Sequence, residues 1–253
     1  MNPGIKVTII GIFANITLSV IKFIGGTIGN STAMVADAVH SLSDLFTDTI
    51  VLVTHKISQI PKDEGHPYGH GRAESIGTTA IGIIIIFAGI GLAYEGWNII
   101  RSESPPIPEP IAAGMALVSI FIKEWLFRYT YSVGKKSNSS LLIANAWHHR
   151  SDAISSIAAL VGIIGSMMGY PMLDPIAAAM VGFMIIHMGY KLTRGGFRDL
   201  MDTALSEKDT RDIQGVIDEI SGVIKTHDLR TRKIGGEVLI DVHIQVDSDL
   251  TVT

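Results

Sequence analysis

Two histidine–aspartate pairs are the residues of this chain best suited to bind a metal ion. His40 precedes Asp44 by four positions, and His148 precedes Asp152 by the same interval. Side chains four positions apart on a helix project from the same face. Two imidazole nitrogens and two carboxylates form a complete tetrahedral ligand set for a zinc-like divalent ion. The pairs therefore predict a site for such an ion.

Each pair lies in a segment apolar enough to cross a lipid bilayer. An ionisable side chain at membrane depth costs roughly 2.5–3.5 kcal/mol on insertion scales, so such residues usually mark a pathway or a site. A bound divalent ion offsets this cost, and so does protonation of the carboxylates. Metal binding needs neutral imidazole and ionised carboxylate, so metal and protons compete, which is the physical basis of exchange between them. The alternative is a hydrogen-bond network that only joins the helices.

Composition points to a polytopic membrane protein. The 253 residues are 47% hydrophobic and 17% charged, whereas soluble domains are about a quarter charged. There is no cysteine, which excludes disulfides and thiolate metal sites and leaves His, Asp and Glu as ligands. No cleavable signal peptide is expected, because the first apolar run, from about Val7, is long enough to span the membrane and lacks a clear cleavage site. No nucleic-acid partner is expected.

The apolar runs predict an α-helical polytopic membrane protein with six transmembrane helices. Single charges interrupt several runs: we expect Lys22 to reach an interface, and Glu124 to pair with Arg128 four positions on. Lys and Arg gather on one side of these spans, so the positive-inside rule predicts that both termini are cytoplasmic. The expected spans are residues 7–28, 33–57, 75–100, 110–133, 141–168 and 173–192.

The two pairs lie in an internal repeat. Residues 35–44 and 143–152 are identical at five of ten positions, and they fall in the second and fifth expected spans, which run in opposite directions. Inverted repeats of three helices each, with a site at their interface, are a common plan in transporters. Asp37 and Asp48 extend the face of the first pair. We expect them to support the ligands or to line an access path, with plain interface polarity as the alternative.

A second cluster of metal-ligating residue types follows the second expected span. Asp63, His66 and His70 have metal-ligand spacing within the glycine-rich segment 62–72. Carboxylate and imidazole are both ligands that zinc accepts, so this loop is a candidate second metal site. The alternative is an ordinary solvated loop.

Beyond the sixth expected span the chain changes character. Ser206 is placed to cap a helix that has acidic residues in its first turn. Strand-like runs at 226–234 and 237–246 follow, separated by two glycines. The second run alternates apolar and polar residues, as a half-buried strand should. The pattern predicts one helix followed by a β-hairpin.

These features divide the chain into a transmembrane domain, residues 1–205, and a cytosolic αββ domain, residues 206–253. One helix and a hairpin make a thin core, so we expect this small α+β domain to be C-terminally incomplete, cut short here or completed by a partner. The hairpin could bring His227 and His243 together as a partial metal site. Two histidines are too few for a tight site, and ordinary surface or core histidines are the alternative.

Four motifs together carry a family resemblance. They are His-Ser-Leu-Ser-Asp at 40–44, His-Pro-Tyr-Gly-His-Gly-Arg-Ala-Glu-Ser at 66–75, His-His-Arg-Ser-Asp at 148–152 and His-Asp-Leu-Arg-Thr-Arg at 227–232. With them, the chain resembles the cation diffusion facilitator family of zinc/proton antiporters over almost its whole length. The resemblance implies six spans, a homodimer and a metallochaperone-like αββαβ cytosolic domain, whose final helix and strand are absent here. It also implies a transporter, not an enzyme, that exports a divalent cation from the cytoplasm in exchange for protons.

Carried over residue by residue, the resemblance implies three metal sites and one charge interlock. The interlock, which in the family joins two subunits, would involve Arg72 and Asp202 near the dimer interface. Some bacterial members have Asp where His40 stands, and the two-His, two-Asp set resembles the zinc-selective pattern, since imidazole suits zinc and oxygen ligands suit manganese. Cobalt and cadmium remain alternatives. The sites are His40, Asp44, His148 and Asp152 for transport, Asp63, His66 and His70 in the loop, and His227 and His243 in the cytosolic domain.

These inferences predict a Zn²⁺/H⁺ antiporter, multi-pass in the inner membrane of a bacterial cell, that works by alternating access. Two alternatives belong to other classes. A metal sensor or scaffold would bind zinc without moving it. An intramembrane metalloprotease would need a general base such as the Glu of His-Glu-x-x-His, and no His-Glu pair occurs in the sequence.

Overall fold

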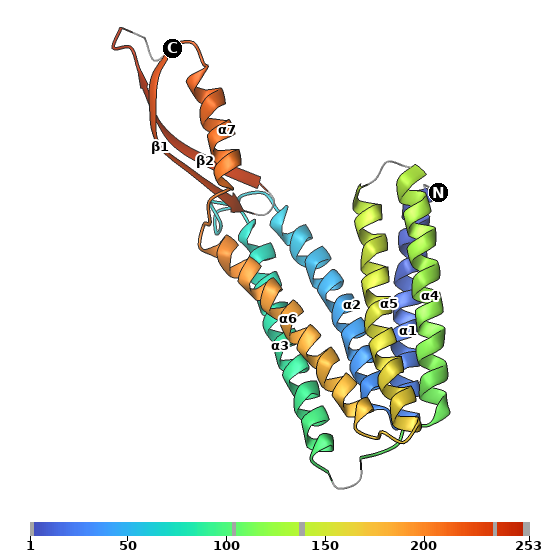
Figure 1. Cartoon of the computed structure of the whole chain (residues 1–253). Helices are drawn as coiled ribbons and strands as arrows, with labels where there is room; N and C mark the ends of the chain where they lie inside the picture. Colours follow the sequence, from blue (N-terminus) through green and yellow to red (C-terminus); the bar gives the residue numbers. More distant parts are fainter. Residues whose placement is uncertain (1–2, 103–104, 137–139, 235–236, 250–253) are drawn as a thin grey trace. The chain divides into compact units, whose positions relative to one another are not determined.

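The computed structural model describes residues 3–102, 105–136, 140–234 and 237–249. Six long helices are followed by one short helix and a two-stranded sheet (Figure 1). Every expected span is helical, and the sixth extends farthest beyond its apolar run. The helices are α1 (Pro3–Ile28), α2 (Thr32–Ser58), α3 (Arg72–Ile100), α4 (Pro110–Lys136), α5 (Ser140–Met167), α6 (Leu173–Leu200) and α7 (Glu207–Asp218), and the strands are β1 (Val223–Ile234) and β2 (Glu237–Val246).

Four of the helices in the described part of the chain, α1, α3, α4 and α6, are long and apolar enough to cross a membrane. The other two long helices, α2 and α5, have 27 and 28 residues. These two carry the His–Asp pairs, and their ionisable side chains lower their hydropathy. A polar stripe on two helices of an otherwise apolar bundle is what a site at membrane depth requires.

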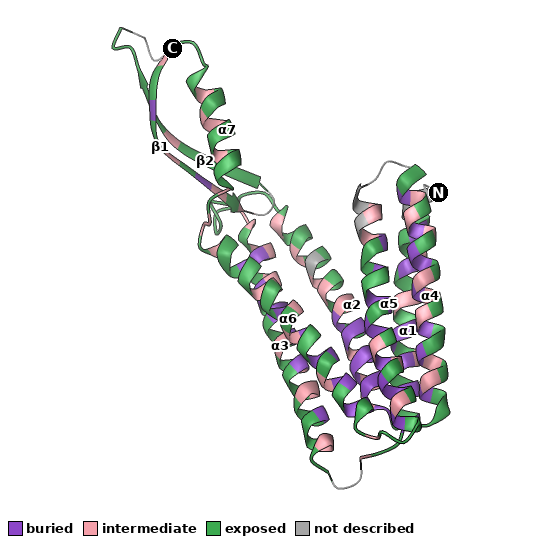
Figure 2. Ribbon diagram, in the orientation of Figure 1, coloured by how far each residue is buried: buried purple, intermediate pink, exposed green. Residues whose placement is uncertain are grey.

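The chain packs as two units, one made of Met1–Asp48 with Ile83–Tyr190 and the other of Thr49–Gly82 with Lys191–Thr253. In the first unit, α4 packs against α5 and against α1. Buried residues gather on α1, α4, α5 and the first half of α2 (Figure 2). The core of this unit therefore surrounds the helices that carry the two pairs. Its fully buried apolar side chains include Met34, Leu126, Ile163 and Ile185.

The start of α2 is held by a carboxylate from the first turn of α6. Asp174 accepts a hydrogen bond from Ser31 Oγ at 2.6 Å and bonds from the backbone N–H groups of Thr32 at 2.7 Å and Ala33 at 3.3 Å. Ser31 Oγ accepts a bond from the Met34 N–H at 3.0 Å, as an N-cap does. These bonds satisfy donors that a helix leaves free and place negative charge at its positive end. They anchor the helix that carries the first pair.

Lys22 does not reach an interface, so that expectation is wrong. Its side chain is fully buried on α1, where Nζ lies 2.8 Å from Asp37 Oδ2. The ammonium also donates to Ser41 Oγ at 3.0 Å and to Ser156 Oγ at 2.9 Å. Because all three ammonium donors find acceptors inside the bundle, the side chain has no need to extend to water.

In the second unit, α7 packs against β1, and β1 pairs antiparallel with β2. Ser206 is the N-cap of α7, as predicted, because its side chain accepts a hydrogen bond from the Asp209 N–H at 3.2 Å. The expectation of a half-buried second strand is wrong. The apolar side chains of β2 are largely exposed, with Ile240 at 44% and Ile244 at 47%. One strand and one short helix bury too little surface to cover them.

Candidate metal site

The two His–Asp pairs face each other from α2 and α5. Ligand atoms of His40, Asp44 and Asp152 all lie within 4.8 Å of one another. His148 Nε2 lies 3.9 Å from Asp44 Oδ2, and His148 Nδ1 lies 3.7 Å from Asp152 Oδ1. The structure therefore brings together all four residues that the sequence singled out. His148 lies at the edge of this group of three, near both carboxylates. Imidazole nitrogens and carboxylate oxygens are the donor types that zinc takes at about 2.0–2.2 Å.

Most of these donors are buried, and two donor atoms have no hydrogen-bond partner among the described residues. His40 is 8% exposed and Asp152 is 2% exposed. Within the described residues, neither His40 Nδ1 nor Asp44 Oδ2 has a hydrogen-bond partner. Buried polar atoms are nearly always satisfied, so these two mark a place where a ligand fits. His148, whose side chain is 44% exposed, lies on the open side of the site.

A lysine that sequence reasoning missed contacts the site. Lys123 Nζ, on α4, lies 2.6 Å from Asp152 Oδ2 and 2.9 Å from Asn15 Oδ1 on α1. The lysine side chain is 2% exposed. Its position carried a signal, because a lysine in the interior of an apolar span, far from either end, needs a buried partner. Which carboxylate that partner would be could not be predicted from the spacing of residues along the chain.

The two acids that flank the first pair have different surroundings. Asp37 is fully buried, pairs with Lys22, and accepts hydrogen bonds from Ser155 at 2.9 Å and Ser156 at 2.7 Å. It ties α2 to α1 and α5, and its oxygens are already occupied by these partners. Asp48 is exposed, one turn beyond the ligand carboxylate of α2. Its place beside an access path stays a prediction.

The loop residues also come together, within the second unit. Donor atoms of Asp63, His66 and His70 lie within 4.8 Å of one another. His66 Nδ1 lies 3.1 Å from Asp63 Oδ1, and His70 Nε2 lies 3.6 Å from Asp63 Oδ2. The backbone N–H of His66 donates to Asp63 Oδ1 at 2.6 Å, and this bond holds the pKa of the Asp63 carboxyl below its usual value. Gly69, at φ 83°, supplies the left-handed turn between the two histidines.

Arg72 and Asp202 form an ion pair within the second unit, in which one guanidinium nitrogen contacts both carboxylate oxygens. Arg72 Nη2 lies 2.9 Å and 3.0 Å from the two carboxylate oxygens of Asp202. Arg72 Nη1 also donates to the Leu200 carbonyl at 3.2 Å. The start of α3 and the end of α6 are thereby joined in one chain. The place of this pair near a dimer interface stays a prediction.

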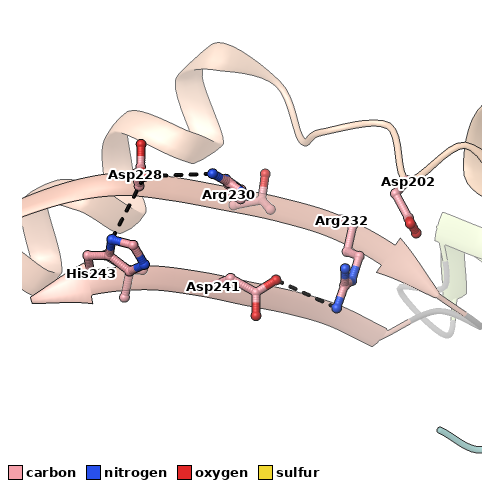
Figure 3. A pocket seen from close by; sticks show the side chains of 8 residues that line it. Asp202, Asp228, Arg230, Arg232, Asp241 and His243 are labelled. Carbon is pink, nitrogen blue, oxygen red and sulfur yellow. Dashed lines mark ion pairs between the residues drawn. The ribbon is translucent and has the colours of Figure 1, made fainter.

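His227 and His243 are cross-strand partners on β1 and β2, with ring centroids 5.3 Å apart. A cavity of about 260 Å³ lies beside His243. Figure 3 shows residues that line it, among them Asp228, which lies 3.8 Å from His243 and 3.6 Å from Arg230. In the described chain this pair is not part of a group of three close ligands. Because Arg230 already pairs with Asp228, these histidines form at most a partial site.

Comparison with known families decides the class of this chain. Residues 8–201 match the family model described as the cation efflux transmembrane domain, and residues 205–253 match the one described as the cytoplasmic domain of cation efflux proteins. The chain belongs to the cation efflux family. This is the cation diffusion facilitator family that the four motifs indicated, so the resemblance is confirmed.

Several relatives of this cation efflux protein align over nearly all of it. Metal tolerance protein C1 of Arabidopsis thaliana is 38% identical over 259 residues, which cover 96% of the chain and only 55% of that relative's length. Magnetosome protein MamB of Magnetospira sp. (strain QH-2) is 36% identical over 240 residues, covering 95% of the chain and 82% of the relative. Manganese efflux system protein MneP of Bacillus subtilis is 34% identical over 254 residues, covering 98% and 85%.

Family membership tests two predictions, the membrane fold and the class of transporter. The matched transmembrane domain extends from α1 to the end of α6. The chain is therefore a multi-pass membrane protein, as predicted, with six long helices in its transmembrane domain, four of which meet the criteria for a span within the described residues, and a small α+β C-terminal region. Members of the cation efflux family are transporters and not enzymes, so the metalloprotease alternative is wrong.

Proposed function

We propose that this cation efflux protein exports a divalent metal cation, Zn²⁺ first among them, from the cytoplasm in exchange for protons. The observation that carries the proposal is the convergence of the two His–Asp pairs inside the membrane-spanning helices. Buried donors without a protein partner favour a passing cation over a network that only joins helices. The relatives named for metal tolerance and manganese efflux support a metal as the cargo.

The donor set favours zinc among the divalent ions. Imidazole nitrogen suits zinc, and four ligands in a tetrahedron are its usual coordination. Manganese prefers oxygen ligands, and only two of the four residues offer them. Manganese is nevertheless the second candidate, because one relative at 34% identity is named for manganese efflux. Cobalt and cadmium are further candidates.

Protons are the proposed counter-substrate because they compete with the metal for the same atoms. Zinc needs His40 and His148 as neutral imidazoles, together with two ionised carboxylates. Metal that binds from the cytoplasm therefore releases protons, and acid on the other side drives the metal off. The pairs lie on α2 and α5, the central helices of the inverted halves. Rocking of one half against the other would expose the site to each side in turn.

The proposed location is the cell (inner) membrane, where the protein would be a homodimer with cytoplasmic termini. The excess of Lys and Arg on one side of the spans supports this orientation. The match of residues 205–253 to a cytoplasmic domain supports it independently. Arg72, the first residue of α3, and Asp202, two residues beyond the end of α6, are the proposed charge interlock beside the interface between two copies.

Reconstitution into liposomes with a trapped pH indicator tests this function. A zinc gradient should drive proton movement in the wild type, and Asp44→Asn and Asp152→Asn should each abolish it. Asp44→Asn should unfold close to the wild-type temperature, whereas Asp152→Asn should be less stable because it leaves Lys123 buried without its carboxylate partner. Glu124→Gln is the matched control, since it removes a carboxylate from the exposed pair with Arg128. Unchanged flux in both Asn variants would overturn the site. Zinc binding without flux in the wild type would favour a sensor or scaffold, and parallel runs with manganese rank the two metals.

A further inference from the structure

The ammonium of Lys123 already occupies part of the candidate transport site. Its Nζ lies 2.6 Å from Asp152 Oδ2, and the two side chains are 2% and 3% exposed. The other carboxylate oxygen, Asp152 Oδ1, faces His148 Nδ1 at 3.7 Å. Asp152 thus turns one oxygen toward the metal ligands and the other toward a lysine. A metal bound to Asp152 would share this carboxylate with a buried positive charge.

A second buried lysine, Lys22, forms a lysine–aspartate ion pair that does not involve any candidate metal ligand. Lys22 has three acceptors, the Asp37 carboxylate and the hydroxyls of Ser41 and Ser156, which match its three donors. Lys123 has two acceptors among the described residues, the ligand carboxylate and Asn15 Oδ1 at 2.9 Å. The first lysine is fixed on all sides. The second is held less completely, and one of its two acceptors is a metal ligand.

We propose that Lys123 is a tethered counter-cation that competes with the transported metal for Asp152. This proposal rests on the proposed function, because it assumes that Asp152 binds the cargo. Without metal, the ammonium neutralises the buried carboxylate. With metal, the ammonium shifts toward Asn15, and repulsion between the two cations weakens the bound state. Lys123 is a positioning residue: it lowers the affinity of the site so that a strongly bound cation is released in each transport cycle.

Zinc titration calorimetry on the purified full chain, together with zinc flux in liposomes, tests the competition. Lys123→Gln should bind zinc about tenfold more tightly or more, because a charge a few ångströms away interacts strongly even at an effective dielectric constant of about 20. Its maximal flux should fall, since release slows. Lys123→Arg should restore most of both values. Arg128→Gln is the matched control: it removes a positive charge from the same helix, where Arg128 pairs with Glu124 at 2.8 Å, as the spacing predicted.

A second variant should change zinc affinity in the opposite direction, and it tests the proposal if Lys123→Gln does not yield folded protein. Asn15→Leu removes the alternative acceptor, so the ammonium stays on Asp152 and zinc should bind more weakly. Unchanged or weaker zinc binding by folded Lys123→Gln, or unchanged binding by Asn15→Leu, would overturn the proposal. Asp152→Asn distinguishes a failure of the proposed transport site from a failure of the proposed competition. If it binds zinc like the wild type, the transport site itself is wrong; if it loses zinc while Lys123→Gln binds like the wild type, only the competition is wrong.

Discussion

Lys22 and Asp37 form an ion pair at 2.8 Å between α1 and α2, and neither side chain has any exposed surface. Serine hydroxyls complete the hydrogen bonds of both partners, from α2 for the lysine and from α5 for the lysine and the aspartate. The pair therefore joins three helices beside the metal site without using a metal ligand. Lys123, by contrast, pairs with Asp152, a candidate metal ligand. One buried lysine joins helices of the bundle, and the other contacts the candidate transport site.

Replacement of Lys22 by Met should destabilise the protein strongly. The variant leaves Asp37 buried without its cation, which costs about 3–5 kcal/mol when one partner of a buried pair is removed. Thermal unfolding in detergent measures the loss. The double variant Lys22→Met with Asp37→Leu should recover most of it, because no charge is then left unpaired. A single variant that unfolds at the wild-type temperature would show that the pair contributes little.

The Arg72–Asp202 pair should contribute little to folding and more to association. Its side chains are 48% and 37% exposed, and exposed ion pairs contribute about 0–1 kcal/mol. If the pair lies beside the interface between two copies, Arg72→Gln should shift the protein toward monomer in light-scattering measurements, most clearly at low salt. The exchange variant, Arg72→Asp with Asp202→Arg, should restore dimer. Wild-type association of Arg72→Gln would place the interface elsewhere.

Replacement of His40 by Asp should move the metal preference away from zinc. The variant keeps four ligands but replaces one imidazole with an oxygen donor, and oxygen ligands suit manganese better than zinc. Competition flux with equal zinc and manganese measures the ratio, which should shift toward manganese by tenfold or more, about 1.4 kcal/mol in relative affinity. His187→Asn is the control, since His187 lies on α6 outside the ligand set. An unchanged ratio would remove His40 from the selectivity determinants.

The loop site should lose its metal on acidification before Asp63 is protonated. Protons compete with zinc for imidazole nitrogen, whereas the lowered pKa of Asp63 keeps this carboxyl ionised down to pH values below its usual range. The contribution of Asp63 to affinity is thus present at neutral pH and is lost only as pH falls through that lowered pKa. Zinc stoichiometry measured against pH checks this order. His66→Ala with His70→Ala should remove one zinc per chain at neutral pH and leave flux detectable; loss of no zinc would contradict a loop site.

Local patterns in the sequence predicted much of this molecule. The six apolar runs are helices, Ser206 caps α7, and Glu124 pairs with Arg128. In each case the relevant partners lie within a few positions of one another, so periodicity and spacing carry the information. The proximity of His40, Asp44, His148 and Asp152 also followed from spacing and from the repeat of the same pair in a second span; their role as metal ligands stays a prediction.

Contacts between distant segments could not be predicted in the same way. The buried position of Lys22 could not be predicted, because its acceptors lie on two other helices, α2 and α5. The contact of Lys123 with the candidate site could not be predicted, because its partner Asp152 is 29 positions away on another helix. The alternation in β2 predicted a half-buried strand, yet its apolar side chains are exposed. Periodicity specifies which side chains share a face, and only tertiary packing decides what covers that face.

Anomalous diffraction at the zinc edge, from crystals of the full chain saturated with zinc, would locate the bound ion. We expect a zinc peak between α2 and α5, about 2.0–2.2 Å from donor atoms of both His–Asp pairs, and the loss of this peak in Asp152→Asn. Zinc at the loop cluster alone, with no peak among the four residues His40, Asp44, His148 and Asp152, would contradict this expectation.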